Sequence, residues 1–180
     1  HPREYFTHEN RPIRLTSLRE KLQRIADQGV DRLYIGRFNA RFAALTAEQF
    51  IEEILVRGLG ARHLMIGDDF RFGKGRQGDF ALLEATGKTA GFTVEAMHTL
   101  VHDGERVSSS AVREALAEGD MPHAARLLGH PYSISGRVMH GDKIGRSIGF
   151  PTANIQLKHR SPPLMGIYTV SVEGLVDTPW

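Results

Sequence analysis

Apolar positions in the first 129 residues alternate between helical and strand spacing. Capping boxes open two helical segments at 17–20 and 46–49, and Gly29 and Gly58 are expected to end these helices. A third helix is predicted at about 79–89, and short apolar runs predict strands at 33–35, 63–66 and 92–96. Strands separated by helices of this length predict βαβ units, and hence an α/β fold with a parallel sheet.

The pattern changes after Gly119. A short helix is predicted at 120–128, ended by Gly129, and from Tyr132 the apolar period becomes two. A second strand of this kind is predicted at 167–173. We therefore place a domain boundary near 129–131, with an α/β domain at 1–129 and the start of a β-barrel at 130–180.

A glycine-rich turn at 141–154 is the most informative stretch of candidate chemistry. Its glycines permit close backbone approach to a ligand, its two cations suit phosphate oxygens, and its hydroxyl and carboxamide suit a Mg²⁺-nucleotide. The residues concerned are Gly141, Lys143, Gly145, Arg146, Gly149, Thr152 and Asn154. The alternative interpretation is a plain turn between two strands of a barrel.

Two segments of the first domain fall where ligands bind in parallel sheets, beyond the carboxyl ends of strands. The loop at 67–79 holds four glycines. It also carries two aspartates, cations that suit phosphate oxygens and two aromatic rings that can stack on a flat ligand: Asp68, Asp69, Phe70, Arg71, Phe72, Lys74 and Arg76. It is not a P-loop, since Gly75 stands where Ser or Thr is required. The alternative is a solvated loop whose phenylalanines anchor it to the core.

The second segment is the serine run 108–110, followed by Val112 and Arg113. Serines here will cap a helix, and a helix N-terminus with free N–H groups and hydroxyls also binds anions. Arg113, one turn along, can reach the same anion. Capping alone is the alternative interpretation.

These motifs, taken in order, resemble the bacterial bifunctional riboflavin kinase/FAD synthetase family. The resemblance extends over essentially the whole chain through four separated matches at 1–2, 67–73, 106–113 and 149–154, the last carrying the Pro-Thr-Ala-Asn signature of riboflavin kinases. It implies a Rossmann-like nucleotidyltransferase domain followed by the start of a riboflavin-kinase-type barrel.

For the first domain, the resemblance implies transfer of AMP from ATP to FMN, giving FAD and pyrophosphate. The serine run looks like the family's Ser-Ser-Thr-x-x-Arg motif, with Ser110 in place of threonine. By this likeness Arg106, Ser109, Ser110 and Arg113 bind ATP, and Asp69, Phe70 and Phe72 bind flavin or nucleotide. The family's His-x-Gly-His motif does not occur in the sequence, so we expect this chain to be a poor adenylyltransferase.

For the second domain, the resemblance implies transfer of the ATP γ-phosphoryl to riboflavin. Its ATP-binding residues are expected to be Gly141, Lys143, Gly145, Arg146, Thr152 and Asn154, with Thr152 and Asn154 holding Mg²⁺ together with ATP. The expected cofactor is Mg²⁺, and the substrates are ATP, riboflavin and FMN. No catalytic base is assigned, because neither Glu173 nor Asp177 stands in a matching motif.

Composition narrows the remaining possibilities. A formal charge of +2, from 23 basic and 21 acidic side chains, indicates neither a nucleic-acid footprint nor a membrane-binding patch, and no apolar run is long enough for a membrane span. Zero cysteines fit a cytoplasmic location, and the nine histidines are scattered without a metal-binding spacing. The opening without methionine and the abrupt end lead us to expect a fragment of a longer chain.

Two other functions stay open. One is a single-activity adenylyltransferase of the same superfamily, acting on a pantetheine or nicotinate nucleotide, against which the Pro-Thr-Ala-Asn segment argues. The other is a catalytically inactive flavin- or nucleotide-binding module. Titration with FMN and Mg²⁺-ATP, followed by a search for product, separates binding from turnover.

Overall fold

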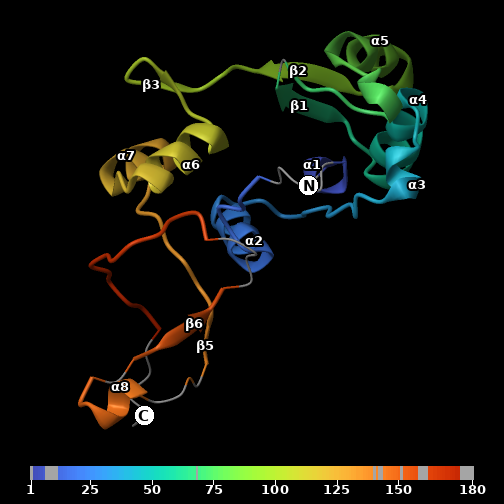
Figure 1. Cartoon of the computed structure of the whole chain (residues 1–180). Coiled ribbons are helices and arrows are strands. Elements are labelled where there is room, and N and C mark those ends of the chain that lie inside the picture. The colour runs from blue at the N-terminus through green and yellow to red at the C-terminus, as the bar shows by residue number, and fades with distance from the viewer. Residues whose placement is uncertain are drawn as a thin grey trace. The chain divides into compact units, whose positions relative to one another are not determined.

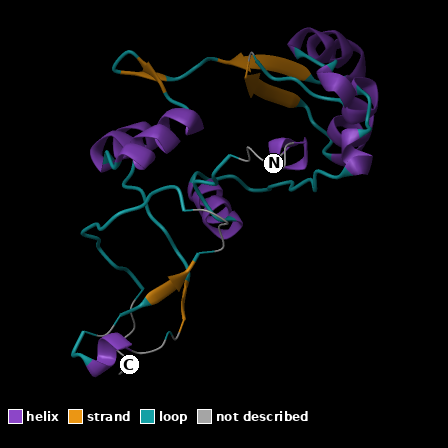
Figure 2. Ribbon diagram, viewed as in Figure 1, coloured by secondary structure: helices purple, strands orange, loops and turns teal. Residues whose placement is uncertain are grey.

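The computed structural model describes residues 2–6, 12–67, 69–139, 141, 144–150, 152–157 and 162–174. Contacts divide the chain into two compact units, one of residues 1–12 and 26–107 and the other of residues 13–25 and 108–180. Each is described by itself below, and Figures 1 and 2 show their elements.

The first unit contains a parallel pair of strands connected through a helix. β1 (His63–Gly67) pairs in parallel with β2 (Thr93–Met97), and α5 (Phe80–Ala90) lies between them in sequence. This βαβ arrangement confirms the predicted α/β content and parallel sheet (Figure 1).

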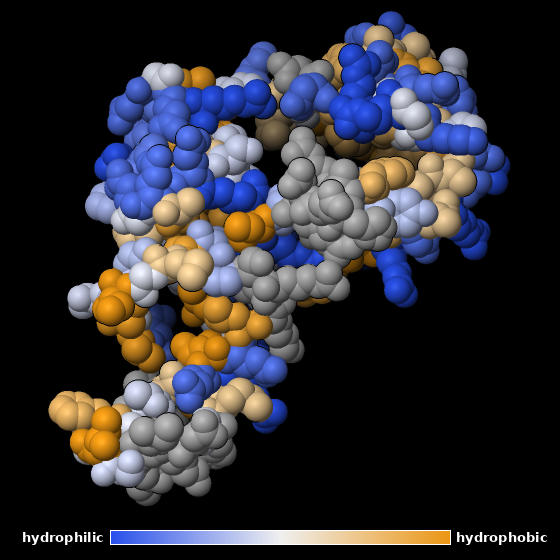
Figure 3. All heavy atoms as spheres, in the orientation of Figure 1, coloured by the Kyte–Doolittle hydropathy of each residue, from blue (hydrophilic) through white to orange (hydrophobic). Residues whose placement is uncertain are grey.

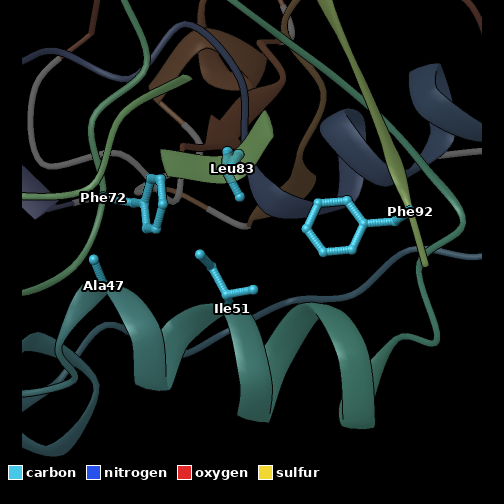
Figure 4. Close-up of a cluster of buried hydrophobic side chains, with 5 residues drawn as sticks. All are labelled: Ala47, Ile51, Phe72, Leu83 and Phe92. Carbon is cyan, nitrogen blue, oxygen red and sulfur yellow. The ribbon is translucent and has the colours of Figure 1, made fainter. Parts of the chain in front are cut away.

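The core of this unit is a cluster that joins the helices to the strands. Ala47, Ile51, Phe72, Leu83 and Phe92 are each at most 6% exposed, and Figure 4 shows their side chains pointing toward one another. Ile51 comes from a continuous helical stretch made of α4 (Ala47–Gln49) and the π-helix η1 (Phe50–Gly58). Burial of these apolar side chains supplies the main stabilising term of the unit.

The capping signals predicted from the sequence are present. Thr46 Oγ1 accepts from the Gln49 N–H at 3.2 Å, and Gln49 Oε1 accepts from the Thr46 N–H at 2.9 Å. Ser17 and Glu20 make the same reciprocal pair at the start of α2 (Leu18–Asp27). Both boxes satisfy backbone donors that a helix start leaves unpaired.

Several short elements were not predicted. They are α1 (Pro2–Phe6), α3 (Ala40–Ala43), η2 (Lys74–Arg76) and the hairpin of β3 (Val101–His102) with β4 (Glu105–Arg106). The hairpin turns at Asp103 and Gly104, both with positive φ. An Asp-Gly pair with this geometry is typical of a tight two-residue hairpin turn.

The second unit contains two consecutive helices, α6 (Ser109–Glu118) and α7 (Met121–Leu128). Gly119 and Gly129 end them in the left-handed conformation, and the stop at Gly129 was predicted. Buried side chains along the two helices form their apolar contact: Val112, Ala115, Leu116, Ala124 and Leu127.

An antiparallel pair follows α7. β5 (Arg137–Met139) pairs with β6 (Asn154–Gln156), and α8 (Ile144–Ser147) lies in the connection between them. This pair is the only sheet in the described part of the chain after residue 130. Figure 3 shows hydrophobic atoms at the surface around these elements.

Three strand predictions are wrong wholly or in part. Residues 33–35 and 167–173 form no strand in the structure, and the strand predicted from Tyr132 is confined to β5. A strand requires hydrogen-bonded neighbours, and the apolar side chains of these segments lie exposed instead, with Ile35 at 56% and Val170 at 70%.

Candidate functional site

The loop at 67–79 leaves the carboxyl end of β1 and is closed on itself. Phe72 and Gly78 exchange two backbone hydrogen bonds of 3.1 and 3.0 Å, and Arg71 Nη1 lies 2.8 Å from Asp79 Oδ2. Asp79 also caps α5 by accepting from the Leu82 N–H, and this bond together with Arg71 lowers the pKa of Asp79 below its ordinary value. The carboxylate therefore ties the loop to the helix that follows.

Backbone contacts fix the middle of the same loop. Gly73 has φ +73°, and a Cβ there would lie 2.7 Å from the Ala47 backbone, so no larger residue fits. The Lys74 N–H donates to the Leu45 carbonyl at 2.7 Å. The loop is thus held against the start of the α4–η1 helix.

The two phenylalanines of the loop differ in burial. Phe72 is 6% exposed and belongs to the core, as the core-anchor interpretation expects. Phe70 is partly buried and stacks on Phe72 with ring centroids 5.6 Å apart. Phe70 therefore has more surface available to a ligand than Phe72.

Asp69 and Arg106, far apart in sequence, lie together in the first unit. Arg106 Nη2 is 3.7 Å from Asp69 Oδ2, with both side chains well exposed. Asp68, the other acidic candidate of this loop, lies outside the described residues. An exposed pair at this distance contributes little stability, so both groups are able to engage a ligand.

The three serines at 108–110 have different roles at the start of α6. Ser108 is the N-cap, and its Oγ accepts from the Ala111 N–H at 3.1 Å. Ser109 and Ser110 occupy the first helical positions, and their exposed hydroxyls make no hydrogen bond within the described part of the chain. The capping interpretation therefore applies to Ser108 and leaves two hydroxyls at a helix N-terminus.

Arg113 lies one turn further along α6, and its guanidinium is already engaged. Its Nε donates to the Ile13 carbonyl at 2.6 Å and its Nη1 to the Ser109 carbonyl at 2.9 Å. The remaining nitrogen, Nη2, has no hydrogen bond to the described residues. The Arg113 side chain is thus anchored beside the Ser109 backbone.

A hydrogen-bond network around residues 13–20 was missed by sequence reasoning. The Tyr132 hydroxyl donates to the Leu15 carbonyl at 2.9 Å, and the Ser135 N–H donates to Glu20 at 2.6 Å. Arg24 donates to Ser133 Oγ at 2.8 Å. The partners lie more than 100 residues apart, and no local signal in the sequence indicates them.

Burial and hydrogen bonding shift two pKa values in this network. Burial, assisted by the Glu20 charge, raises the pKa of Tyr132 to about 12. Burial also opposes ionisation of Glu20, but hydrogen bonds from Ser17 and Ser135 outweigh it and lower the pKa of Glu20 below its ordinary value. The phenol therefore stays a donor, and the carboxylate stays an acceptor, near neutral pH.

The glycine-rich turn joins β5 to β6 and brings four of its candidate residues together in pairs. A Cβ on Gly141 would lie 2.5 Å from Asn154 Nδ2, and one on Gly145 would lie 3.1 Å from Thr152 Cγ2. The Phe150 N–H closes the turn by donating to the Gly145 carbonyl at 2.7 Å. The glycine backbone therefore lies directly against the Thr152 methyl group and the Asn154 carboxamide.

Two candidate cations of this turn are not placed. Lys143 and the side chain of Arg146 lie outside the described residues. The described residues contain no group of three or more metal-binding side chains. In the same part of the chain, every helix is too short or too polar to cross a membrane.

Comparison with known families gives two matches along the chain. Residues 1–111 match the family model described as FAD synthetase, and residues 128–178 match the one described as riboflavin kinase. The first match covers the loop at 67–79 and the serine run, and the second covers the glycine-rich turn.

Curated relatives match across almost the whole chain. A protein of Escherichia coli K12 is 51% identical over 178 residues, covering 99% of this chain and 57% of the relative. A protein of Pseudomonas fluorescens is 52% identical over 172 residues, covering 96% of this chain and 55% of the relative. Both are described as bifunctional riboflavin kinase/FMN adenylyltransferase, and the chain spans little more than half the length of each.

A crystal structure from Streptococcus pneumoniae, described as a macrolide-efflux protein, resembles this chain with a TM-score of 0.68 and 29% sequence identity. The similarity covers 82% of this chain and 47% of that one.

Proposed function

Because the chain belongs to the FAD synthetase family, we propose that it forms part of a bifunctional enzyme that converts riboflavin to FMN and FMN to FAD. The observation that carries this proposal is the match of 51% identity over 99% of the chain to a protein described as having both activities. The adenylyltransferase domain is assigned to residues 1–129 and the riboflavin kinase domain to 130–180, and the antiparallel pair of β5 with β6 supports the proposal that a barrel starts there.

In the adenylyl transfer, a phosphate oxygen of FMN attacks the α-phosphorus of ATP, and pyrophosphate leaves. No protein nucleophile is required, since positioning and charge neutralisation supply the acceleration. Ser109, Ser110 and Arg113 are assigned to the ATP phosphates, because the first turn of α6 presents two hydroxyls and the Arg113 guanidinium, from one turn along, is bonded beside them to the Ser109 carbonyl. Arg106 assists, and its ionic contact with Asp69 links it to the flavin-binding loop, to which we also assign Phe70 and Phe72.

In the kinase reaction, the ribityl 5′-hydroxyl of riboflavin attacks the γ-phosphorus of ATP; the hydroxyl proton and ADP leave. The Oγ1 of Thr152 and the Oδ1 of Asn154 are neutral oxygen ligands of the kind that Mg²⁺ accepts, and this ion would neutralise phosphate charge. Gly141 and Gly145 allow the backbone to approach these two side chains. Lys143 and Arg146 are assigned to the phosphates on the sequence motif alone.

The proposal also includes a cytoplasmic location and small-molecule substrates, without a nucleic-acid or membrane partner. The near balance of 23 basic and 21 acidic side chains and the absence of cysteine from the sequence support it.

Separate substitutions test the two activities. In the complete bifunctional enzyme of which this chain is proposed to form part, Thr152→Ala should abolish FMN formation from riboflavin and leave FAD formation from added FMN unchanged, whereas Ser110→Ala should do the reverse. Titration of each variant with Mg²⁺-ATP should show the loss of one binding event only. Equal loss of both activities in either variant would indicate a folding defect, and binding of both ligands without product would favour an inactive binding module.

A further inference from the structure

Within the second unit, residues 13–20 form hydrogen bonds both with α6 and with the segment that begins at Tyr132. The Ile13 carbonyl accepts from Arg113 on α6, and the Leu15 carbonyl, two residues later, accepts from Tyr132. Both acceptors are backbone atoms of one short segment. A displacement of the backbone at Leu15 should therefore also move the Ile13 carbonyl.

The far end of this segment is held by Glu20. Its Oε2 accepts from the Ser17 N–H and its Oε1 from the Ser135 N–H, both at 2.6 Å. Arg24, one turn along α2, adds its bond to Ser133. Residues 13–20 are thus attached to residues 132–135 through Leu15 and Glu20, and we refer to this arrangement as the clasp.

The clasp determines where the Arg113 guanidinium lies. A guanidinium is planar, so fixing Nε and Nη1 also fixes the direction of Nη2. The Ser109 carbonyl lies on Arg113's own helix and supplies one of these anchors, while Ile13 supplies the other from outside the helix. Without the Ile13 carbonyl, the guanidinium would keep a single anchor and could rotate about it.

We propose that Tyr132 and Glu20 are positioning residues for Arg113. They lock the clasp so that the Ile13 carbonyl orients the guanidinium beside the first turn of α6, and they thereby couple that turn to the start of the segment that matches riboflavin kinase. The positioning stands on the observed hydrogen bonds, and its use in ATP binding rests on the proposed function. Neither residue touches the nucleotide in this proposal.

The direct test follows the Arg113 Nε–H proton by NMR in the whole chain. Tyr132→Phe removes one hydrogen bond of the clasp without changing the ring, and Tyr168→Phe is the matched control, since its hydroxyl also donates to a carbonyl at 2.9 Å in the same unit. Loss of one hydrogen bond should speed exchange of the Arg113 Nε–H with solvent about two- to tenfold in Tyr132→Phe. The control should leave it unchanged.

Glu20→Gln provides a second variant, because an amide offers one acceptor oxygen where the clasp uses two. It should speed the same exchange while the backbone amides of α6 keep their protection. Unchanged Arg113 exchange in both variants would overturn the proposal. So would equal acceleration of the Ala115 amide, which would indicate general loosening of α6.

Titration with Mg²⁺-ATP separates this inference from the proposed function. The Arg113 Nε–H signal should shift on binding, and half-saturation should require about two- to tenfold more nucleotide in Tyr132→Phe than in Tyr168→Phe. If the variants alter exchange as expected but the signal ignores Mg²⁺-ATP in every protein, the positioning by the clasp is supported, and the assignment of Arg113 to ATP phosphates fails.

Discussion

Gly145→Ala should weaken binding of Mg²⁺-ATP at the Thr152 site. A Cβ on Gly145 would overlap the Phe150 carbonyl oxygen and lie 3.3 Å from the Phe150 carbonyl carbon and 3.1 Å from Thr152 Cγ2. The obstacle is mostly backbone, which cannot rotate away as a side chain does. The chain from Phe150 to Thr152 must therefore shift to admit the methyl group.

The size of the effect follows from how freely this turn can relax. Overpacking in a well-packed region typically costs about 1–3 kcal/mol. Phe150 is 75% exposed and Ile148 66% exposed, so the turn faces solvent and can move at low cost. We therefore expect the lower part of that range, about 1–1.5 kcal/mol, which corresponds to roughly five- to tenfold weaker nucleotide binding.

The assay is a titration with Mg²⁺-ATP that follows the Thr152 methyl signal by NMR. Gly129→Asn is the control, because Gly129 lies outside the turn and has φ +74° with no atom within 4 Å, and asparagine tolerates this conformation. The control should bind nearly as the unaltered chain does. If Gly145→Ala leaves both the methyl signal and the affinity unchanged, the contact between Gly145 and Thr152 does not position that hydroxyl.

Three further predictions concern stability and ionisation. Leu83→Ala should lower the free energy of unfolding by about 2–5 kcal/mol in urea, whereas Leu59→Ala, at a half-exposed position, should change it by about 0.5 kcal/mol or less; equal effects would contradict the assigned core. Because the pKa of Glu20 is lowered in the folded chain, the Glu20 carboxylate stabilises the fold above pH 4.5, and this contribution is lost as the pH falls through the folded-state pKa. Glu20→Gln should therefore flatten the acid limb of the curve of unfolding free energy against pH. An unchanged acid limb would count against the clasp. Because the pKa of Tyr132 is raised to about 12, the neutral phenol stabilises the fold below pH 10.0, and this contribution is lost as the pH rises toward 12. Ultraviolet titration should show one tyrosine that ionises at higher pH than an ordinary tyrosine, and this signal should be missing in Tyr132→Phe. Its persistence in Tyr132→Phe would refute the assignment of the raised pKa to Tyr132.

Local signals in the sequence predicted helix ends well. The capping boxes at 17–20 and 46–49 and the stop at Gly129 are all present, since each depends on a few neighbouring residues. The Asp103-Gly104 turn is also a local signal, but it went unused, and the hairpin of β3 and β4 was therefore missed.

Strands and long-range contacts were predicted less well, for a physical reason. A period of two indicates which side chains share a face of a strand, but it does not supply the neighbouring strand that must form the hydrogen bonds. Residues 167–173 have this period and form no strand in the structure. The clasp illustrates the same limit, because the Glu20 partner Ser135 lies 115 residues away. Among the candidate sites, the loop at 67–79 and the serine run were found from composition, whereas the anchoring of Arg113 by Ile13 was not.

The candidate residues after residue 130 depend on polar contacts more than on an apolar core. Pro163 is the one apolar residue beyond Leu127 that is buried in the described part of the chain. Thr152 and Asn154 are instead located by the pairing of β5 with β6, by the hydrogen bond from Phe150 to Gly145 and by close glycine contacts. Because hydrogen bonds near the surface each contribute only about 0.5–1.5 kcal/mol, few of them can be lost before these side chains become misplaced. Glycine substitutions in the turn should therefore affect this site more than truncation of any single apolar side chain around it, the reverse of what holds for the cluster around Leu83.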